Sequence, residues 1–222
     1  LVSFYGRLNW SIDSKYVFIF TARGDGSSKF AKAYRWGFFP SGAFAWNLKK
    51  EPFLADAEDV TALKLRLSAG LTGQQDGIGN YAHLARYNIY IDSYHKYDMG
   101  AENYMGMLYP QAYDPKIRWE TTMTWNVGVD FGFFHDRLSG SVDAYIRNTR
   151  DLLNSVQIPM GSNFGNKLMT NVGSIRNKGL EFSVSGVPVQ TADWSVHLGF
   201  NGTFQSTVFT KLNPTEDRNY YI

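Results

Sequence analysis

Residues 119–134 alternate between two kinds of side chain. They read Trp119-Glu-Thr-Thr-Met-Thr-Trp125-Asn-Val-Gly-Val-Asp130-Phe-Gly-Phe-Phe134. The odd-numbered positions are apolar apart from Thr121, and the even-numbered positions up to Gly132 are polar, charged or glycine. A period of two residues places the two sets on opposite faces of an extended strand. The stretch therefore predicts a long β-strand with one apolar face and one wet face.

The pattern resumes after a short turn at His135 and Asp136. Leu138 and Val142 then fall on one face and Asp143 on the other, which completes an antiparallel hairpin. The same alternation recurs along the chain. It predicts an all-β fold, an antiparallel up-and-down meander of about eight long strands. The expected strands are Val2–Ile12, Lys15–Arg23, Phe38–Leu48, Leu63–Thr72, Trp119–Phe134, Leu138–Arg147, Lys178–Val187 and Trp194–Phe204.

The expected strands are long for a soluble protein. Most run to about ten residues, whereas strands of soluble proteins usually have about five or six. A tilted strand needs about nine to eleven residues to cross a bilayer. Aromatic residues also gather near the strand ends, where membrane barrels carry aromatic girdles. These residues are Trp10, Tyr16, Trp46, Trp119, Phe133 and Trp194.

The connections between the expected strands alternate in length. Short turns lie near Asp13-Ser14, His135-Asp136 and Gln190–Asp193, and long loops occupy residues 24–37, 73–118 and 148–177. Residues 49–61 form an intermediate connection on the short side, with a helical turn expected at Asp56–Asp59. Outer-membrane barrels have short periplasmic turns and long external loops. We therefore expect a multi-pass β-barrel section in the outer membrane of a Gram-negative bacterium.

Composition excludes several classes of function. The chain has no Cys, which excludes a disulfide framework, a cysteine metal site and a thiol nucleophile. Its 22 Lys and Arg residues against 20 Asp and Glu leave a net charge of +2, so no basic surface calls for nucleic acid. Aromatic residues make up 16% although mean hydropathy is −0.30, so rings must be interleaved with polar residues.

The parity of the strands bears on how much of a barrel the chain forms. The first expected strand enters a short turn and the eighth leaves one, so both ends of the chain fall on the long-loop rim. Complete bacterial barrels place both termini in the periplasm. Residues Leu1–Tyr5 also show no signal-peptide pattern. We therefore expect residues 1–222 to be a partial barrel domain, a section of a larger barrel.

Short motifs follow one another along nearly the whole chain. They are Phe4–Asn9 with Lys15-Tyr16, Asp25–Phe30, Arg35–Gly37 with Phe39–Ser41, Glu51–Leu54, Leu63–Arg66 with Gly70–Gly73, Ile78–Tyr81, Trp119–Thr122, Trp125–Gly128, Asp130–Gly132, Thr170–Gly173, Asn177–Glu181 and Lys211–Asn213. In this order and spacing, the set resembles the SusC/RagA-like TonB-linked outer-membrane transporters of Bacteroidetes.

The resemblance implies the C-terminal part of a 22-stranded TonB-dependent barrel, without its plug, TonB box and remaining strands. It implies energy from the TonB complex through the missing N-terminal part, and a SusD-like surface lipoprotein as a lid. It further implies contact with outer-membrane lipid and import of oligosaccharide or peptide cargo. Within such a transporter the chain would supply barrel wall and extracellular loops. We expect no cofactor, no metal and no enzyme activity.

The loop at residues 73–118 holds eight of the 14 tyrosines. Exposed rings on a rigid scaffold can stack on sugar faces or contact a partner protein. Alternatively, the rings pack on one another and on neighbouring loops and give this long loop a core, which is the simpler reading. The candidate substrate or partner contacts are Tyr81, Tyr87, Tyr90, Tyr94, Tyr97, Tyr104, Tyr109 and Tyr113.

Charged residues on the polar strand faces form a second candidate set. They could tune cargo or contact a plug, but a solvated barrel wall with cross-strand ion pairs is the simpler expectation. These residues are Arg7, Arg66, Glu120, Asp130, Asp143, Arg147 and Glu181. The four His lack metal-ligand spacing, and the sequence contains no His-Glu-x-x-His motif, Walker A loop or nucleophile elbow.

Three rival interpretations stay open at this point. A complete eight-stranded outer-membrane barrel could act as an anchor or adhesin, although its termini would lie on the unusual rim. A soluble β-sandwich binding module would need shorter strands and a second sheet over the apolar face. An enzyme would need a Ser/His/Asp set assembled in space, which no sequence motif indicates.

Overall fold

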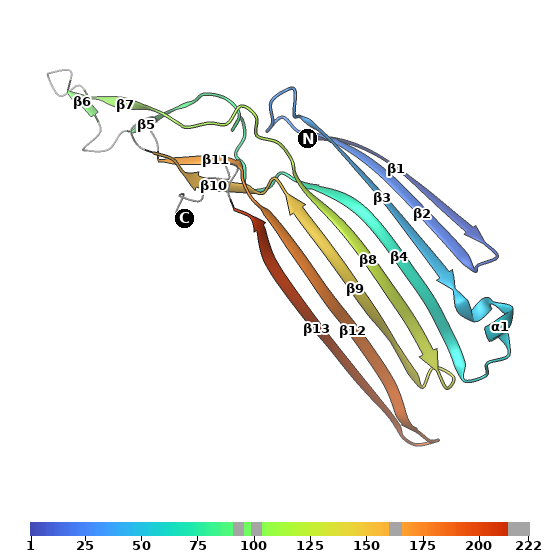
Figure 1. Ribbon diagram of the computed structural model, residues 1–222. Helices are drawn as coiled ribbons and strands as arrows, with labels where there is room; N and C mark the ends of the chain where they lie inside the picture. The colour runs from blue at the N-terminus through green and yellow to red at the C-terminus, as the bar shows by residue number, and fades with distance from the viewer. Residues whose placement is uncertain (91–95, 99–103, 160–165, 213–222) are drawn as a thin grey trace.

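One antiparallel eight-stranded sheet dominates the computed structural model, which describes residues 1–90, 96–98, 104–159 and 166–212. The strand order is β1-β2-β3-β4-β8-β9-β12-β13, so these strands lie side by side in their order along the chain (Figure 1). The bounds are Val2–Ile12 for β1, Tyr16–Gly26 for β2, Trp36–Asn47 for β3, Val60–Gln74 for β4, Glu120–Phe133 for β8, Leu138–Arg150 for β9, Ser174–Gln190 for β12 and Ser195–Lys211 for β13. The predicted meander is confirmed.

The sheet is open. In the described part of the chain β1 pairs with β2 alone and β13 pairs with β12 alone, so these two strands form the edges. A closed eight-stranded barrel requires pairing between β1 and β13, which the sheet does not contain. The fold is therefore a curved wall and not a small complete barrel.

Most strands are longer than the sequence pattern indicated. They range from 11 residues in β1 to 17 in β12 and β13. At about 3.3 Å per residue, 17 residues exceed the thickness of a bilayer core even when the strand is tilted. The wall is therefore taller than the core of a bilayer. We call its long-loop end the outer rim.

The two faces of the wall differ as predicted. Rings of neighbouring strands pair on the apolar face, with centroids 5.9 Å apart for Trp10 and Phe18 and 5.0 Å apart for Phe18 and Phe44. Such cross-strand aromatic pairs stabilise a sheet. Even so, Phe200 and Phe204 on this face remain 67% and 69% exposed. An apolar surface of this extent is suited to lipid contact.

Tight turns join the strands at the opposite end, the short-turn rim. Asp13 and Ser14 have φ values of 50° and 51°, and the N–H of Lys15 donates to the carbonyl of Ile12 over 2.9 Å. This left-handed geometry matches the twist of the two flanking strands.

No helix in the described residues is long and apolar enough to span a membrane.

The connection between β3 and β4 differs from the prediction. It contains η1 (Leu48–Lys50) and α1 (Pro52–Ala55), so the helical turn precedes the expected position at Asp56–Asp59. Pro52 occupies the first turn, where its fixed φ favours a helix start. The ammonium of Lys49 donates to the carbonyls of Leu54 and Ala57 over 3.0 and 2.8 Å.

Two of the long connections contain strands of their own. Residues 73–118 include β5 (Tyr87–Tyr90), β6 (Lys96–Asp98) and β7 (Tyr104–Pro110), which pair in the order β5-β7-β6. Residues 148–177 include the hairpin of β10 (Leu153–Gln157) and β11 (Lys167–Asn171). Both small sheets extend from the outer rim (Figure 1). The predicted long connections are confirmed, but the sequence analysis did not predict the small sheets within them, where Tyr-rich and branched segments pair without a place in the wall.

Candidate functional site

The outer rim carries a hydrophobic cluster formed by Phe30, Phe39, Ile78, Ile117 and Trp119, which we call the outer core. Phe30 and Ile117 are completely buried. The Trp119 ring lies 5.0 Å from that of Phe30 and 5.5 Å, edge-on, from that of Phe39. The cluster joins the β2–β3 and β4–β8 connections to the wall, and Leu153 and Met169 of the β10–β11 hairpin pack against it.

Trp119 corrects one expectation from the sequence. The alternating pattern placed it on the apolar strand face, at the end of a girdle. In the structure β8 begins one residue later, at Glu120, and Trp119 is buried. Its indole N–H donates to the carbonyl of Arg35 over 3.1 Å, which satisfies the polar edge of the ring inside the cluster.

The wall splits beside the outer core. The ladder between β3 and β4 ends at the pair Ser41 and Gly70, and the next residue of β3 is Pro40, which has no N–H to donate. Beyond this point β3 pairs only with β2 and β4 only with β8, and the two strands diverge (Figure 1). The ring of Phe39 fills the gap so closely that a side chain at Gly73 would collide with it.

A hollow of about 600 Å³ opens on the polar face next to this split. Polar residues of β2, β3 and β4 line it, among them Thr21, Ser41 and Thr72. Arg23 donates through Nε to both carboxylate oxygens of Asp25, each over 2.8 Å, at its edge. The Oε1 atom of Gln75 is buried there and has no partner in the described residues. The hollow can therefore accept a hydrogen-bond donor from a bound group.

An ion network crosses three strands on the same polar face. Arg66 on β4 donates through Nε to both oxygens of Asp130 on β8 over 3.0 and 2.9 Å, and through Nη2 to Asp143 on β9 over 2.8 Å. The residue between these groups is Gly128, where any side chain would collide with Asp143. The predicted cross-strand ion pairs are confirmed for this set.

Other members of the predicted polar set make local contacts. Arg7 donates to Asn9 over 3.2 Å, and Glu120 accepts the N–H of Leu153 over 3.0 Å. The guanidinium of Arg147 lies 4.5 Å from the ring centre of Tyr145, within the range of a cation–π contact. Arg7 and Arg147 thus contact residues two positions away on their own strands, whereas Glu120 connects the β10–β11 hairpin to the wall.

The candidate tyrosines are distributed over the projecting connection. Tyr81, Tyr87 and Tyr113 are 58%, 64% and 44% exposed, and none belongs to the outer core. Tyr94 lies outside the described residues. Five of the eight lie on the small sheet: Tyr87 and Tyr90 on β5, Tyr97 on β6, and Tyr104 and Tyr109 on β7. A role of these tyrosines in binding stays a prediction.

Comparison with known proteins assigns the family. Residues 2–221 match the family model of the TonB dependent receptor-like β-barrel. The chain belongs to the TonB-dependent receptor β-barrel family. The TonB-dependent receptor SusC of Bacteroides thetaiotaomicron is 45% identical over 222 residues, which are 100% of this chain and 22% of SusC. TonB-dependent receptor P3 of Formosa agariphila is 36% identical over 218 residues, 98% of this chain and 21% of that receptor.

Solved structures agree. The RagAB peptide importer in its closed-closed state superimposes with a TM-score of 0.84 at 30% identity, over 95% of this chain and 22% of that chain. In the open-open state the TM-score is 0.81. This TonB-dependent receptor chain thus spans about a fifth of the length of its relatives. It is a section of a SusC/RagA-like outer-membrane barrel, as the sequence motifs predicted.

The sequence did not indicate the outer core, the split or the hollow beside Gln75. One signal was available, since Pro40 interrupts a stretch that otherwise reads as a strand, and proline in a sheet marks an unpaired edge. No group of three or more His, Asp or Glu in the described ranges could hold a metal ion.

Proposed function

We propose that residues 1–222 form an eight-strand section of the wall and outer loops of a TonB-dependent transporter. In the complete protein, the TonB complex would supply energy through the part that carries the plug. A SusD-like surface lipoprotein would close over the outer rim. The cargo would be an oligosaccharide or a peptide. We assign the chain no catalytic role, since its family is one of receptors and transporters.

The observation that carries this proposal is the family match along residues 2–221, on a sheet with one lipid-facing and one polar face. SusC, the relative at 45% identity, is named a TonB-dependent receptor, and RagAB is named a peptide importer. A polar inner wall stabilised by the Arg66 network suits a water-filled or plugged lumen. The anchor or adhesin alternative is less well supported, because the described sheet is open.

Uptake by the full-length protein in its own outer membrane tests the transport proposal. Cells would be given a labelled oligosaccharide and a labelled peptide, with and without TonB. We expect uptake of one of the two to require both the receptor gene and TonB. Uptake that depends on the receptor but not on TonB would indicate passive diffusion and contradict the proposal.

We further propose that the exposed tyrosines of the β4–β8 connection contact the lid lipoprotein or the cargo. Tyr81, Tyr87 and Tyr113 support this, because exposed aromatic rings are typical of binding surfaces. The triple change to Ala should reduce recovery of the lid with the affinity-tagged full-length receptor. Tyr5→Ala is the matched control, because Tyr5 is 79% exposed on the polar face of β1, a strand that pairs with β2 and not with this connection. Equal lid recovery and equal uptake in all variants would contradict the proposal.

A further inference from the structure

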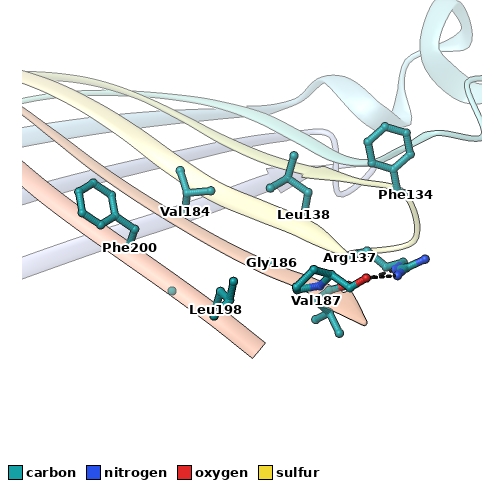
Figure 2. Close-up of a pocket in the computed structure, with 10 residues that line it drawn as sticks. Phe134, Arg137, Leu138, Val184, Gly186, Val187, Leu198 and Phe200 are labelled. Atoms are coloured by element: carbon teal, nitrogen blue, oxygen red, sulfur yellow. Dashed lines mark hydrogen bonds between the residues drawn. The ribbon is translucent and has the colours of Figure 1, made fainter. Parts of the chain in front are cut away.

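A groove of about 580 Å³ lies on the apolar face of the wall at the short-turn rim. Leu138 of β9, Val184 of β12, and Leu198 and Phe200 of β13 form its sides (Figure 2). The strand register places Gly186 directly between Leu138 and Leu198. Because Gly186 has no side chain, the row of apolar side chains is interrupted there, and the backbone of Gly186 forms the floor of the groove.

The missing side chain at Gly186 is not required by local crowding or by the backbone. An added Cβ would lie 3.6 Å from the carbonyl oxygen of Arg137 and 4.0 Å from Cδ1 of Leu138, both ordinary van der Waals contacts. Its φ also lies outside the left-handed region. A larger residue could therefore be accommodated, and glycine keeps open a space that a side chain would fill.

Arg137 lies at the rim end of the groove with its guanidinium held in place. Nε donates to the carbonyl of Val187 over 3.2 Å and Nη2 to that of Pro188 over 3.0 Å (Figure 2). Both carbonyls belong to an irregular step of β12 between Gly186 and Val189, where the register with β13 shifts. This shift turns the two carbonyls toward Arg137 and fixes the cation beside an apolar channel.

The charge of Arg137 is not neutralised by its neighbours. Within the described ranges no carboxylate lies within 4.0 Å of its guanidinium. The adjacent Asp136 lies against Gly132, whose position in β8 belongs to the polar face of the wall. The Arg137 side chain is exposed, so its remaining N–H groups are available to an anion.

We propose that this groove binds a glycerophospholipid of the inner leaflet, with an acyl chain along Gly186 and the phosphate on Arg137. The short turns of outer-membrane barrels face the periplasm, so this rim lies at the inner leaflet, which is made of phospholipid. Guanidinium groups suit phosphate because their N–H donors are planar and fixed. An apolar channel that ends at a fixed cation matches one acyl chain attached to one phosphate.

Native mass spectrometry of the detergent-purified full-length receptor tests this proposal. The probe is 1-palmitoyl-2-oleoyl-phosphatidylglycerol, titrated beside a diacylglycerol with the same chains. We expect Arg137→Gln to weaken phosphatidylglycerol binding about tenfold, the size of effect typical of a lost charge-assisted contact. Gly186→Leu should weaken it to a similar extent by filling the groove, while Arg137 and its carbonyl partners stay in place.

Arg176→Gln is the matched control. Arg176 is exposed on β12, the strand of Gly186, and on the same face, but at the outer-rim end of that strand. This variant should bind phosphatidylglycerol as the wild type does. Equal affinity for diacylglycerol would overturn the role of Arg137. Equal losses of phosphatidylglycerol binding in Arg137→Gln and Arg176→Gln would show general charge attraction only. If the wild type bound lipopolysaccharide more tightly than phosphatidylglycerol, the assignment of the site to the inner leaflet would be contradicted. If Arg137→Gln fails to fold, Gly186→Leu alone decides, and unchanged binding there overturns the proposal.

Discussion

The two rims of the same sheet are stabilised in different ways. The outer rim has the outer core, a set of buried rings and aliphatic side chains from β3 and two connections. Of the buried hydrophobic residues in the described ranges, only Tyr145 lies away from that rim, in the middle of β9. The short-turn rim has turns and single polar anchors instead. The comparison shows that one strand pattern builds the wall, while each end needs its own means of fixing its connections.

Glu51 is the main anchor at the short-turn rim. Its carboxylate accepts the hydroxyl of Tyr16 over 2.6 Å, the indole N–H of Trp46 over 3.0 Å and the ammonium of Lys15 over 3.4 Å. Only 9% of the residue is exposed. One side chain thus ties the β3–β4 connection to the ends of β2 and β3, where the outer rim uses a cluster of five.

Of the changes considered, Phe30→Ala should destabilise the protein most, and it tests the outer rim. Removing a fully buried ring typically costs about 3–5 kcal/mol, and here the cost falls on the outer core. We expect faster hydrogen exchange at residues 26–36 and 75–86 of the full-length receptor, with little change in β12 and β13. Phe38→Ala is the control, because Phe38 is 64% exposed on the same strand as Phe39. Equal effects of the two changes would show that the outer core does not stabilise these connections.

Arg66→Met should have the next largest effect and tests the wall between the rims. It leaves Asp130 and Asp143 without their shared cation, at a site about one-third exposed. We expect a loss of about 2 kcal/mol after allowing for solvent screening. Thermal unfolding of the full-length receptor in detergent measures it.

Arg7→Met is the comparison variant for Arg66, since Arg7 bonds only to nearby Asn9 among the described residues and should cost about 0.5 kcal/mol at most. Adding Asp130→Asn and Asp143→Asn to Arg66→Met should restore part of the lost stability, because the repulsion between the two carboxylates disappears. No recovery would indicate that the network contributes through packing and not through charge.

The sequence predicted the wall because its physics is local. A period of two residues assigns the face of every strand residue, so the eight-stranded meander and the presence of cross-strand ion pairs on its polar face could be predicted. The outer core could not. Phe30, Ile78 and Ile117 lie in connections without periodicity, and only the folded chain brings them to Trp119. The start of β8 at Glu120, and not at Trp119, follows from that burial.

The groove at Gly186 could not be predicted from the alternation of apolar and polar residues either. Glycine on an apolar face has several meanings in a strand, and the sequence does not say which one applies. The register between three strands and the position of Arg137 decide it. The helix at Pro52–Ala55 is a smaller case, because the carbonyl contacts of Lys49 that favour it depend on the fold of the whole connection.

Acidification should loosen the short-turn rim before the outer rim. Hydrogen bonds from Tyr16 and Trp46 lower the pKa of Glu51 from its ordinary value of 4.5. A lowered pKa means that the stabilisation is complete above 4.5 and is lost as pH falls through the value in the folded protein. We expect exchange at residues 48–59, corrected for intrinsic rates, to rise below about pH 4.5.

In Glu51→Gln, the amide hydrogens of residues 48–59 should exchange faster at neutral pH, and their exchange should lose this pH dependence. Glu58→Gln is the control, because Glu58 is exposed in the same connection. A pH dependence that survives in Glu51→Gln would assign it to another group and weaken the picture of a single anchor at this rim.

Arg118→Gln should have the smallest effect. Its guanidinium pairs with Asp151 over 2.7 Å, and this partner raises the pKa of Arg118, but the two side chains are 50% and 36% exposed. Exposed pairs contribute about 0.5 kcal/mol, and about 1 M salt should remove even that.

Asn171 bonds the same segments through their backbone, accepting the N–H of Arg118 and donating to the carbonyls of Arg118 and Asp151, each over 2.8 Å. Asn171→Ala should therefore destabilise the β10–β11 hairpin by about 2 kcal/mol at any salt concentration. A larger and salt-sensitive effect of Arg118→Gln would mean that charge, and not burial and backbone bonding, holds this part of the outer rim.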